Sequence, residues 1–530
     1  MTSSTPVRRP LLLAFGGLLL AMFIAALDQT IMATALPTIA GDLGGLSSLP
    51  WAVTAYVLAA AAVTPIWGKA SDLYGRKDLL RGAIVLFALA SALSGLSQSI
   101  GELIAFRAVQ GIGAGGVMTL AMATVGDLVE PRERGRYQGY IQFVFVLASV
   151  AGPLLGGLFV DHLSWRWVFY VNLPVGAAAL WLLTRYLHVP AQRRPARIDF
   201  LGAGLLAAAV SAILLATTWG GDRYAWGSAP IIGLAGVAVV LLVAFVVRER
   251  IAPEPVLPLR LFHDPVFVVV SGTLFITTLS LFAAIVFLPV FLQLVTGASA
   301  TTSGLLVLPL LIASAVSTVV SGRIISRTGR YKVFPVIGLA LMSLGLLSLS
   351  TLDESSSRLT AGLFMAVFGA GFGMVTQVLM VAIQNAVDPR EIGTATASAN
   401  LFRALGGAVG VAIYGAVFSS GLRHWLPREL PGGLPAGIDP RGIQVSPGRI
   451  HAFAPAVQHG IAQAVASSLD DVFLIAAPIA LAGFLLVLAL REVPLRGRGA
   501  ASRSAQPGST ASAASKPQQS TTAIRRSQNI

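Results

Sequence analysis

The chain of 530 residues has no cysteine and very few charged side chains. Without cysteine it can form neither a disulfide framework nor a reactive thiolate. Charged residues make up 11% of the chain, against about 25% in soluble domains, so they cannot cover a water-facing surface of this size. Hydrophobic residues make up 55%. These proportions exclude a soluble globular protein and indicate an all-α protein that crosses a lipid bilayer many times.

Apolar runs of about 20 residues, the length of a membrane-spanning helix, recur along the chain. We predict fourteen spans, at residues 11–34, 51–70, 79–99, 101–125, 137–160, 167–187, 199–218, 230–247, 266–294, 303–323, 333–351, 359–385, 394–420 and 470–491. An even number of spans places both termini on one side. Arg8 and Arg9 precede the first run, which has no small-residue cleavage site, so we expect a span there and not a signal peptide.

The lysines and arginines select the side on which the termini lie. If the termini are cytoplasmic, the inner segments hold most of the basic residues, and the outer loops keep mainly Arg166, Arg223, Arg358 and four arginines of residues 421–469. We therefore expect a protein of the cytoplasmic membrane with both termini inside. The net charge of +14 follows from this topology, and no nucleic-acid partner is expected.

Three segments lie outside the predicted spans. Residues 1–10 form a short cytoplasmic N-terminus, and residues 492–530, rich in Ser, Ala, Gln and Thr, form a disordered tail. Residues 421–469 form one long outer loop, either a connector or a lid over an exit route. Its later part has helical spacing and predicts a short helix on the outer face, with Ile450, Phe453, Val457, Ile461 and Val465 on one side.

An internal repeat divides the chain into two halves. The segment at residues 68–77 follows the second span, and residues 322–330 follow the tenth span with the same glycine spacing. In a transporter built from two six-helix halves, the second copy comes six spans later, whereas here it comes eight spans later. We therefore predict an N-terminal bundle at 11–187, two inserted helices at 199–247 and a C-terminal bundle at 266–491.

Several motifs occur in order on these spans. The loop after the second span matches G-x-L-[AS]-D-x-x-G-R-[KR] at Gly68, Asp72, Gly75, Arg76 and Lys77, with Ala70 in place of the usual Leu. The fourth span contains Arg107, Gln110, Gly111, Gly113 and Gly115. The fifth span contains Gly152, Pro153, Gly156 and Gly157 of a G-x-x-x-G-P-x-x-G-G motif whose first glycine is Ala148. Two further short sequence motifs lie at residues 27–37 and 165–174.

Together these motifs resemble the fourteen-span drug/proton antiporter family of the major facilitator superfamily over residues 11–491. The resemblance implies two six-helix bundles plus two extra helices, with a substrate cavity between the bundles near the midplane. It adds Asp127 as a partner of Asp72 and Arg76 in a latch that opens as the halves rock; a plain positive-inside anchor is the alternative. Gly152 and Pro153 predict a kinked fifth span, closely packed between the halves, for which ordinary small-residue packing is the alternative.

Asp28 is the most informative single residue, because an ionisable side chain inside an apolar span is costly and marks a functional site. Asp28 and Arg107 each lie about six residues from the outer end of their spans, or about 9 Å deep at 1.5 Å per residue. We expect both to face the same cavity, with Asp28 as the proton and cation site and Arg107 as its modulator. A permanent structural ion pair is the alternative.

Two other features carry less weight. Arg403 lies in the thirteenth span without an acidic residue in the second half to neutralise it. Its partner could be a polar residue of the twelfth span, an anionic lipid or substrate. The glycines at 111–116 also fit G-x-G-x-x-G, but no strand precedes them and close helix packing explains them better.

The sequence therefore predicts a transporter that uses the proton gradient, without a cofactor or a bound metal, to export hydrophobic or cationic drugs. No nucleophile–base set or phosphate loop indicates an enzyme. We expect a monomer in the lipid bilayer with a small-molecule substrate and protons as its partners. Candidate cavity residues are Trp51, Tyr56, Phe143, Phe275, Phe372, Met374 and Arg403. Export of an endogenous lipid or metabolite, and a non-transporting receptor, are the alternatives.

Overall fold

The computed structural model describes residues 8–43, 50–188, 199–221, 223–298, 300–353, 356–430 and 454–495. The described chain is helical, apart from one isolated bridge between Gly220 and Tyr224. The first half contains α1 (Arg8–Leu43), α2 (Pro50–Tyr74), α3 (Arg76–Leu96), α4 (Ile100–Leu128), α5 (Pro131–His162), α6 (Trp167–Tyr170) and α7 (Asn172–Tyr186).

The second half is preceded by two further helices, α8 (Phe200–Trp219) and α9 (Ala229–Ile251). It contains the 3-10 turns η2 (Leu259–His263) and η3 (Pro389–Glu391) and the helices α10 (Pro265–Leu294), α11 (Ala300–Leu306), α12 (Leu308–Thr328), α13 (Val333–Leu349), α14 (Arg358–Ala386), α15 (Ile392–Glu429) and α17 (Pro455–Leu488).

The helices form where the sequence is apolar over the thickness of a bilayer. Thirteen stretches of described helix are long and apolar enough to cross a membrane, and the shorter apolar helix α13 coincides with the predicted span at 333–351. Polar side chains cap the first turns of several helices. The Ser99 side chain caps α4 by accepting a hydrogen bond from the Glu102 N–H, and the Asp264 side chain caps α10 by accepting one from the Val266 N–H. The all-α class and its helices agree with the sequence-based prediction.

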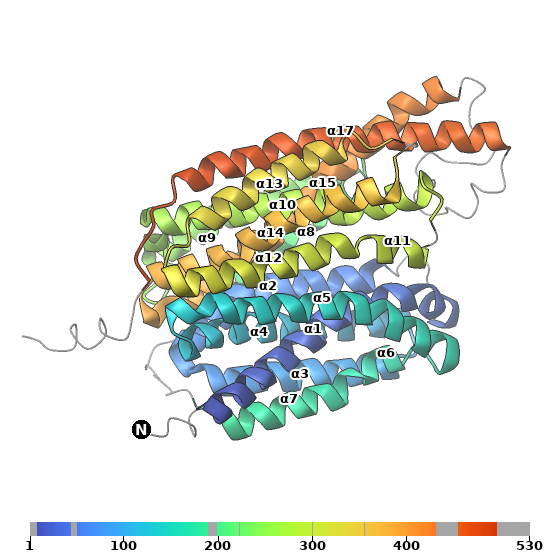
Figure 1. The fold of residues 1–530 in the computed structure, drawn as a ribbon. Helices are drawn as coiled ribbons and strands as arrows, with labels where there is room; N and C mark the ends of the chain where they lie inside the picture. Colours follow the sequence, from blue (N-terminus) through green and yellow to red (C-terminus); the bar gives the residue numbers. More distant parts are fainter. Residues whose placement is uncertain are drawn as a thin grey trace, which may run out of the picture.

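Each half forms its own bundle. In the first, α1 packs on α5 and α7, while α2 and α3 pack on α4; in the second, α10 packs on α15 and α17, while α12 and α13 pack on α14. Across the junction, α2 packs on α15 and α5 packs on α12. Figure 1 shows the helices of the first half, blue to teal, beside the helices of the second, which run from yellow-green to red.

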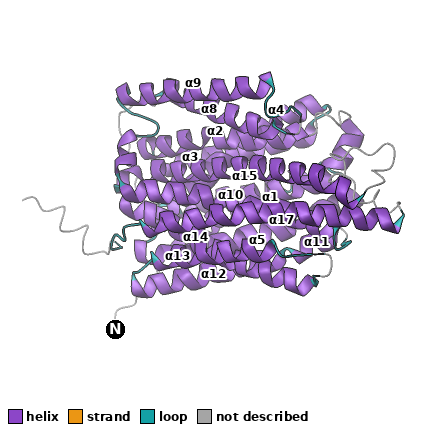
Figure 2. Ribbon diagram, turned by 90° about the horizontal axis from the view of Figure 1, so that it is seen from above, coloured by secondary structure: helices purple, strands orange, loops and turns teal. Residues whose placement is uncertain are grey.

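The inserted helices lie at one edge of the molecule (Figure 2). Helix α8 contacts both α2 and α15, so it bridges the junction between the halves. Helix α9 packs on α8 and exposes Val237, Val239, Val240 and Val243 on its outer side. Exposed valines in such a row suit a surface that faces lipid.

The predicted outer loop at 421–469 is much shorter in the structure. Helix α15 continues to Glu429, through Pro427, and α17 begins at Pro455. Ile461 and Val465 are buried, and α17 packs on α15 there, so the predicted surface helix is instead the first part of the last span. Ile450 and Phe453 lie outside the described residues. The sixth predicted span is divided at Val171 into α6 and α7.

Candidate functional site

Asp28 of α1 is fully buried where three helices of the first half meet. Its carboxylate forms an ion pair with Arg107 of α4. Its Oδ1 also accepts hydrogen bonds from Gln110 Nε2 at 2.8 Å and from Asn172 Nδ2 at 3.0 Å. Asn172 begins α7, so the one carboxylate connects α1, α4 and α7. The structure thus brings together the two charged residues that share a predicted depth.

The guanidinium of Arg107 is equally well surrounded. Its Nη1 donates to Gln110 Oε1 at 2.8 Å, and its Nε donates to the Ala52 carbonyl at 3.3 Å. Its Cζ lies 4.1 Å from the ring centroid of Tyr56, a cation–π contact that adds to the electrostatic stabilisation. Tyr56 itself is fully buried and donates to the Ala25 carbonyl. Tyr56 therefore belongs to this ion-pair cluster.

Gln110 and Asn172 are functional candidates to which the motifs alone assigned no role. Both are polar residues inside apolar spans, and Asn172 lies about as deep in the sixth predicted span as Asp28 lies in the first. The same depth argument that paired Asp28 with Arg107 could therefore have identified Asn172. Its amide also donates to Ser91 Oγ at 3.0 Å, which ties α3 to the cluster.

Asp72, near the end of α2, contacts the beginning of α15 in the other half. Its carboxylate accepts hydrogen bonds from the backbone N–H groups of Gly393 and Thr394, at 3.0 and 2.7 Å, and from the Thr394 hydroxyl at 2.8 Å. The first N–H groups of a helix have no partner within it and favour a negative charge. Asp72 therefore caps a helix of the opposite half and holds the two halves together at this end of the molecule, called the Asp72 end below.

Arg76 connects Asp72 to a second carboxylate. It lies 3.2 Å from Asp72 and 2.7 Å from Asp127 at the end of α4. Gly75 precedes it with φ of 95°, a left-handed conformation that favours glycine and permits the tight turn from α2 to α3. Lys77 does not join this network, because its ammonium donates to the Thr184 carbonyl of α7 at 3.2 Å.

The linker that follows the inserted helices reaches the same end. Glu254 forms an ion pair with Lys69 of α2 at 2.6 Å. Glu249, near the end of α9, accepts from the N–H groups of Val256 and Leu257 and so fixes the linker's path. The inserted pair is therefore attached to the segment that carries Asp72.

The internal repeat forms two equivalent contacts between the halves at the Asp72 end. Gly68 of α2 lies against the backbone of Gly393 in α15, and Gly322 of α12, its counterpart in the second copy, lies against the backbone of Gly135 in α5. A second repeat supplies the partners: residues 130–135 and 388–393 both follow the pattern acidic-Pro-Arg-Glu-x-Gly. This second repeat is visible in the sequence and would have predicted the pairing.

The glycines of α5 pack against α1 of the same half. A methyl group at Gly152 would overlap Thr30 Oγ1, and one at Gly156 would overlap Thr34 Oγ1. Pro153 lies within the helix between them, and Gly157 faces open space. The predicted close packing is present, but it joins α5 to α1 and not one half to the other.

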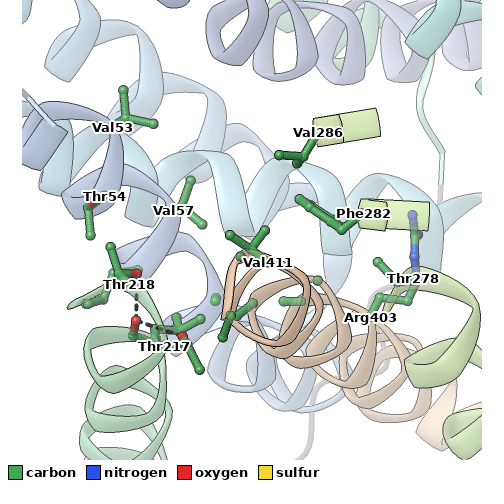
Figure 3. A pocket seen from close by; sticks show the side chains of 18 of the residues that line it. Val53, Thr54, Val57, Thr217, Thr218, Thr278, Phe282, Val286, Arg403 and Val411 are labelled. Carbon is green, nitrogen blue, oxygen red and sulfur yellow. Dashed lines mark hydrogen bonds between the residues drawn. The ribbon is translucent and has the colours of Figure 1, made fainter. Parts of the chain in front are cut away.

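A cavity of about 890 Å³ lies between the halves, with walls from α2, α4, α8, α10 and α15. Its deep end is lined by Thr64, Met122 and Asn400, and its other end reaches the exposed residues Gly221 and Arg423. The cavity therefore opens at the end of the molecule opposite the Asp72 end. Figure 3 shows its walls, with Val53, Thr54 and Val57 of α2 facing Phe282 and Arg403.

Neither Asp28 nor Arg107 lines this cavity. Both side chains are 1% exposed or less, so the expectation that they face the cavity is not met in this conformation. The neighbouring residue Gln29 does line it. A change at Asp28 can therefore reach the cavity wall through α1, which carries Gln29, and through α4, which carries its partners Arg107 and Gln110 and also lines the cavity.

Among the proposed cavity residues, Arg403 alone lines the cavity. The aromatic and methionine candidates do not line the cavity in this conformation, for a common reason: membrane depth is known from the sequence, but the rotation of each helix is not. Trp51 packs edge-on against Trp219, Phe143 is 56% exposed on the outer surface, and Phe372 is buried within α14. The backbone of Phe275 lies against Gly406, and Met374 lies against Gly338.

Comparison with known proteins identifies the class. Residues 18–411 match the family model of the Major Facilitator Superfamily, and the chain belongs to this family of membrane transporters. It is 42% identical over 493 residues to an uncharacterized MFS-type transporter of Mycobacterium tuberculosis, a match covering 93% of this chain and 71% of that one. It is also 40% identical to the multidrug transporter protein MdtP of Bacillus subtilis, covering 75% and 74%.

Solved structures support the fold. The proton:xylose symporter XylE has a TM-score of 0.57 at 16% identity, covering 88% of this chain and 94% of that one. The human organic anion transporter MFSD10 has a TM-score of 0.57 at 17% identity, covering 90% and 100%. At these identities the likeness is one of fold alone. The family and its relatives are transporters and not enzymes.

Proposed function

We propose that this protein exports hydrophobic drugs or toxic compounds across the cytoplasmic membrane by alternating access, driven by inward proton flow. The observation that carries the proposal is the asymmetry of the junction between the halves. A cavity large enough for a drug-sized molecule opens at one end, while capping, ion pairs and glycine contacts hold the Asp72 end shut. The relatives named multidrug transporter and efflux pump favour the same direction of transport.

The basic residues support an inner position for the Asp72 end. Lys69, Arg76 and Lys77 lie there, as do the arginines near the ends of α9 and α12. By the positive-inside rule this end is cytoplasmic, so the conformation described is open to the outside and closed to the cytoplasm. Rupture of the Asp72 and Gly68 contacts would then open the cavity inward.

Proton coupling would act through Asp28. As a carboxylate it accepts from Arg107, Gln110 and Asn172. Once protonated it would lose its charge and part of its acceptor capacity, which loosens the joint between α1, α4 and α7. Because Gln29 follows on α1 and lines the cavity, a shift of α1 would change the substrate site as well.

The test uses inverted vesicles with the protein, an imposed pH gradient and two substrates: radiolabelled chloramphenicol, which is uncharged, and ethidium, a permanent cation. Gradient-dependent uptake of either compound by wild type and its loss in Asp28→Asn would support proton-coupled export. Asp161→Asn is the matched control, because this exposed residue of α5 carries the same substitution far from the cluster.

Uptake that is equal in wild type and Asp28→Asn would place the proton site elsewhere. Uptake of neither compound, with the gradient verified by a pH dye, would contradict export of these drug classes.

A further inference from the structure

Arg403 is a cation in the middle of the membrane-spanning region, and the described part of the chain gives it no counter-ion. It lies eleven residues into α15, or about 16 Å from the helix start, too deep for its side chain to reach the Asp72 end. Its Nε is buried without a hydrogen-bond partner among the described residues, and none of the ion pairs within the described chain includes it.

Arg107 shows which partners this fold provides for a cation that is buried inside one bundle. Arg107 has a carboxylate, an amide, a carbonyl and an aromatic ring around its guanidinium. Among the described residues Arg403 has no polar partner of these kinds, and it lines the open cavity instead. Because a charge at this depth requires compensation, its partner should come from what enters the cavity.

The cavity wall adds neutral donors beside Arg403. Thr278 of α10, drawn next to Arg403 in Figure 3, has a buried hydroxyl with no partner among the described residues. Asn400 lies one turn before Arg403 on α15 and also lines the cavity. A guanidinium, a hydroxyl and an amide make a donor set suited to a carboxylate, sulfonate or phosphate group.

The remaining wall selects the rest of the ligand. The wall formed by α10 is apolar and consists of Phe282, Val286, Phe287 and Val290. Among the described residues that line the cavity there is no Asp or Glu, and its second charged residue, Arg423 at the mouth, is also basic. Asp28 cannot offset these charges, since it is sealed off and paired with Arg107.

We propose that the cavity binds amphiphiles carrying one anionic group, which Arg403 and Thr278 hold while the apolar part packs against α10. This inference rests on the proposed export function and names its substrate class. It reverses the preference for cations expected from Asp28, because the carboxylate is not at the cavity surface. The same chemistry would hold the headgroup of an anionic lipid, and the experiment must separate the two sources.

The test compares three probes that share one apolar body: pyrenebutyrate, pyrenebutanol and pyrenebutyl-trimethylammonium. Their binding to the full-length protein in phosphatidylcholine nanodiscs is measured by equilibrium dialysis against empty discs. We expect the anion to bind wild type more tightly than the cation by about ten- to hundredfold, as for hydrogen bonds to a charged group. Arg403→Gln should remove this preference while leaving binding of the alcohol unchanged.

Three variants make the result specific. Arg403→Lys should retain part of the preference for the anion over the cation. Thr278→Val should weaken binding of the anion alone, and Arg423→Gln should leave the preference for the anion unchanged. The unliganded Arg403→Gln protein should also melt at a higher temperature than wild type, because it no longer buries an unpaired charge. Equal binding of anion and cation by wild type, or a preference that survives Arg403→Gln, would overturn the proposal.

Transport distinguishes this inference from the proposed function. Gradient-driven uptake of chloramphenicol or ethidium, without tighter binding of pyrenebutyrate than of the cationic probe, would contradict the inference and support export. Anion binding that depends on Arg403, without uptake of any compound, would support the inference and contradict export. Displacement of pyrenebutyrate in discs containing phosphatidylglycerol would support the anion site and identify a lipid headgroup as an occupant.

Discussion

At the scale of single residues, the Asp28–Arg107 pair is fully enclosed, and both of its members make further hydrogen bonds. Burial of two charges costs several kcal/mol, and the attraction between them offsets this cost only when further hydrogen bonds satisfy both groups. Gln110, Asn172 and the Ala52 carbonyl provide those bonds. The pair is therefore stable as a unit, and either member alone would be an unpaired buried charge.

Asp28→Asn should destabilise the protein by about 3–5 kcal/mol, because it leaves Arg107 buried without its counter-ion. The double variant Asp28→Asn/Arg107→Gln should recover most of this loss while remaining unable to couple transport to protons. Thermal unfolding of the purified protein in detergent measures both variants, and the Asp161→Asn control should change stability by less than about 0.5 kcal/mol. A double variant no more stable than Asp28→Asn would contradict the interpretation of a coupled pair.

Residue number converts directly into depth along a helix, which explains why the sequence predicted that Asp28 and Arg107 would meet. The direction in which a side chain points depends on the rotation of its helix, and packing against neighbouring helices sets that rotation. Phe143 and Phe372 have suitable depths for a cavity wall but point to lipid and into a bundle, respectively. Arg403 was identifiable because an unneutralised charge is costly in every orientation except toward the cavity.

At the scale of elements, small residues decide how closely α1 and α5 approach. Without a hydrophobic force between helices in lipid, association depends on van der Waals packing, which small residues permit. Gly152 and Gly156 lie against the side chains of Thr30 and Thr34. The Thr30 hydroxyl also donates to the Ala148 carbonyl at 2.9 Å, across the same contact.

Gly156→Ala should destabilise the protein by about 1–3 kcal/mol, the usual cost of adding a methyl group to a closely packed contact. Gly157→Ala is the matched control on the next residue. Its methyl group would meet no atom within 4 Å, and the higher helix propensity of Ala should leave stability unchanged or raise it by up to about 1 kcal/mol. Thermal unfolding of the two variants, side by side in one detergent, makes the comparison. Equal melting temperatures would show that α1 and α5 do not pack as closely as described.

The elements themselves were largely predictable, because an apolar run of bilayer length has few alternatives to a helix. The exception is the segment at 421–469. Its prolines and glycines indicated a loop, yet α15 runs through Pro427 and ends only at Glu429. The spacing of Val457, Ile461 and Val465 was correctly interpreted as helical, but it reflects burial against α15 and not contact with the membrane surface.

At the scale of the whole molecule, the two halves touch through a pair of related contacts. Helix α2 meets α15 at Gly68 and Gly393, and α12 meets α5 at Gly322 and Gly135. Asp72 adds a charged cap to the first contact, whereas its counterpart Ser326 bonds within its own helix, to the Gly322 carbonyl. Under the proposed mechanism both contacts must break when the cavity opens toward the cytoplasm, so a covalent link at either one should stop transport.

The chain lends itself to this experiment because it has no cysteine of its own. A Cβ atom at Gly139 of α5 would lie 3.5 Å from the Cβ of Val319 in α12, within the range of a disulfide. Oxidation of the double variant Gly139→Cys/Val319→Cys should abolish uptake into inverted vesicles, and a reducing agent should restore it. The link would hold the halves in the conformation that is closed to the cytoplasm.

The control places a disulfide of equal reach inside one half. A Cβ atom at Gly483 of α17 would lie 3.5 Å from the Cβ of Ile276 in α10, and both helices belong to the second bundle. Gly483→Cys/Ile276→Cys should therefore keep its uptake after oxidation, since rigid-body rocking does not separate α10 from α17. The cross-link in the oxidised Gly139→Cys/Val319→Cys variant is verified by its resistance to a thiol reagent. If that variant still transports, the halves do not separate at this end. Alternating access by rocking would then be wrong for this protein.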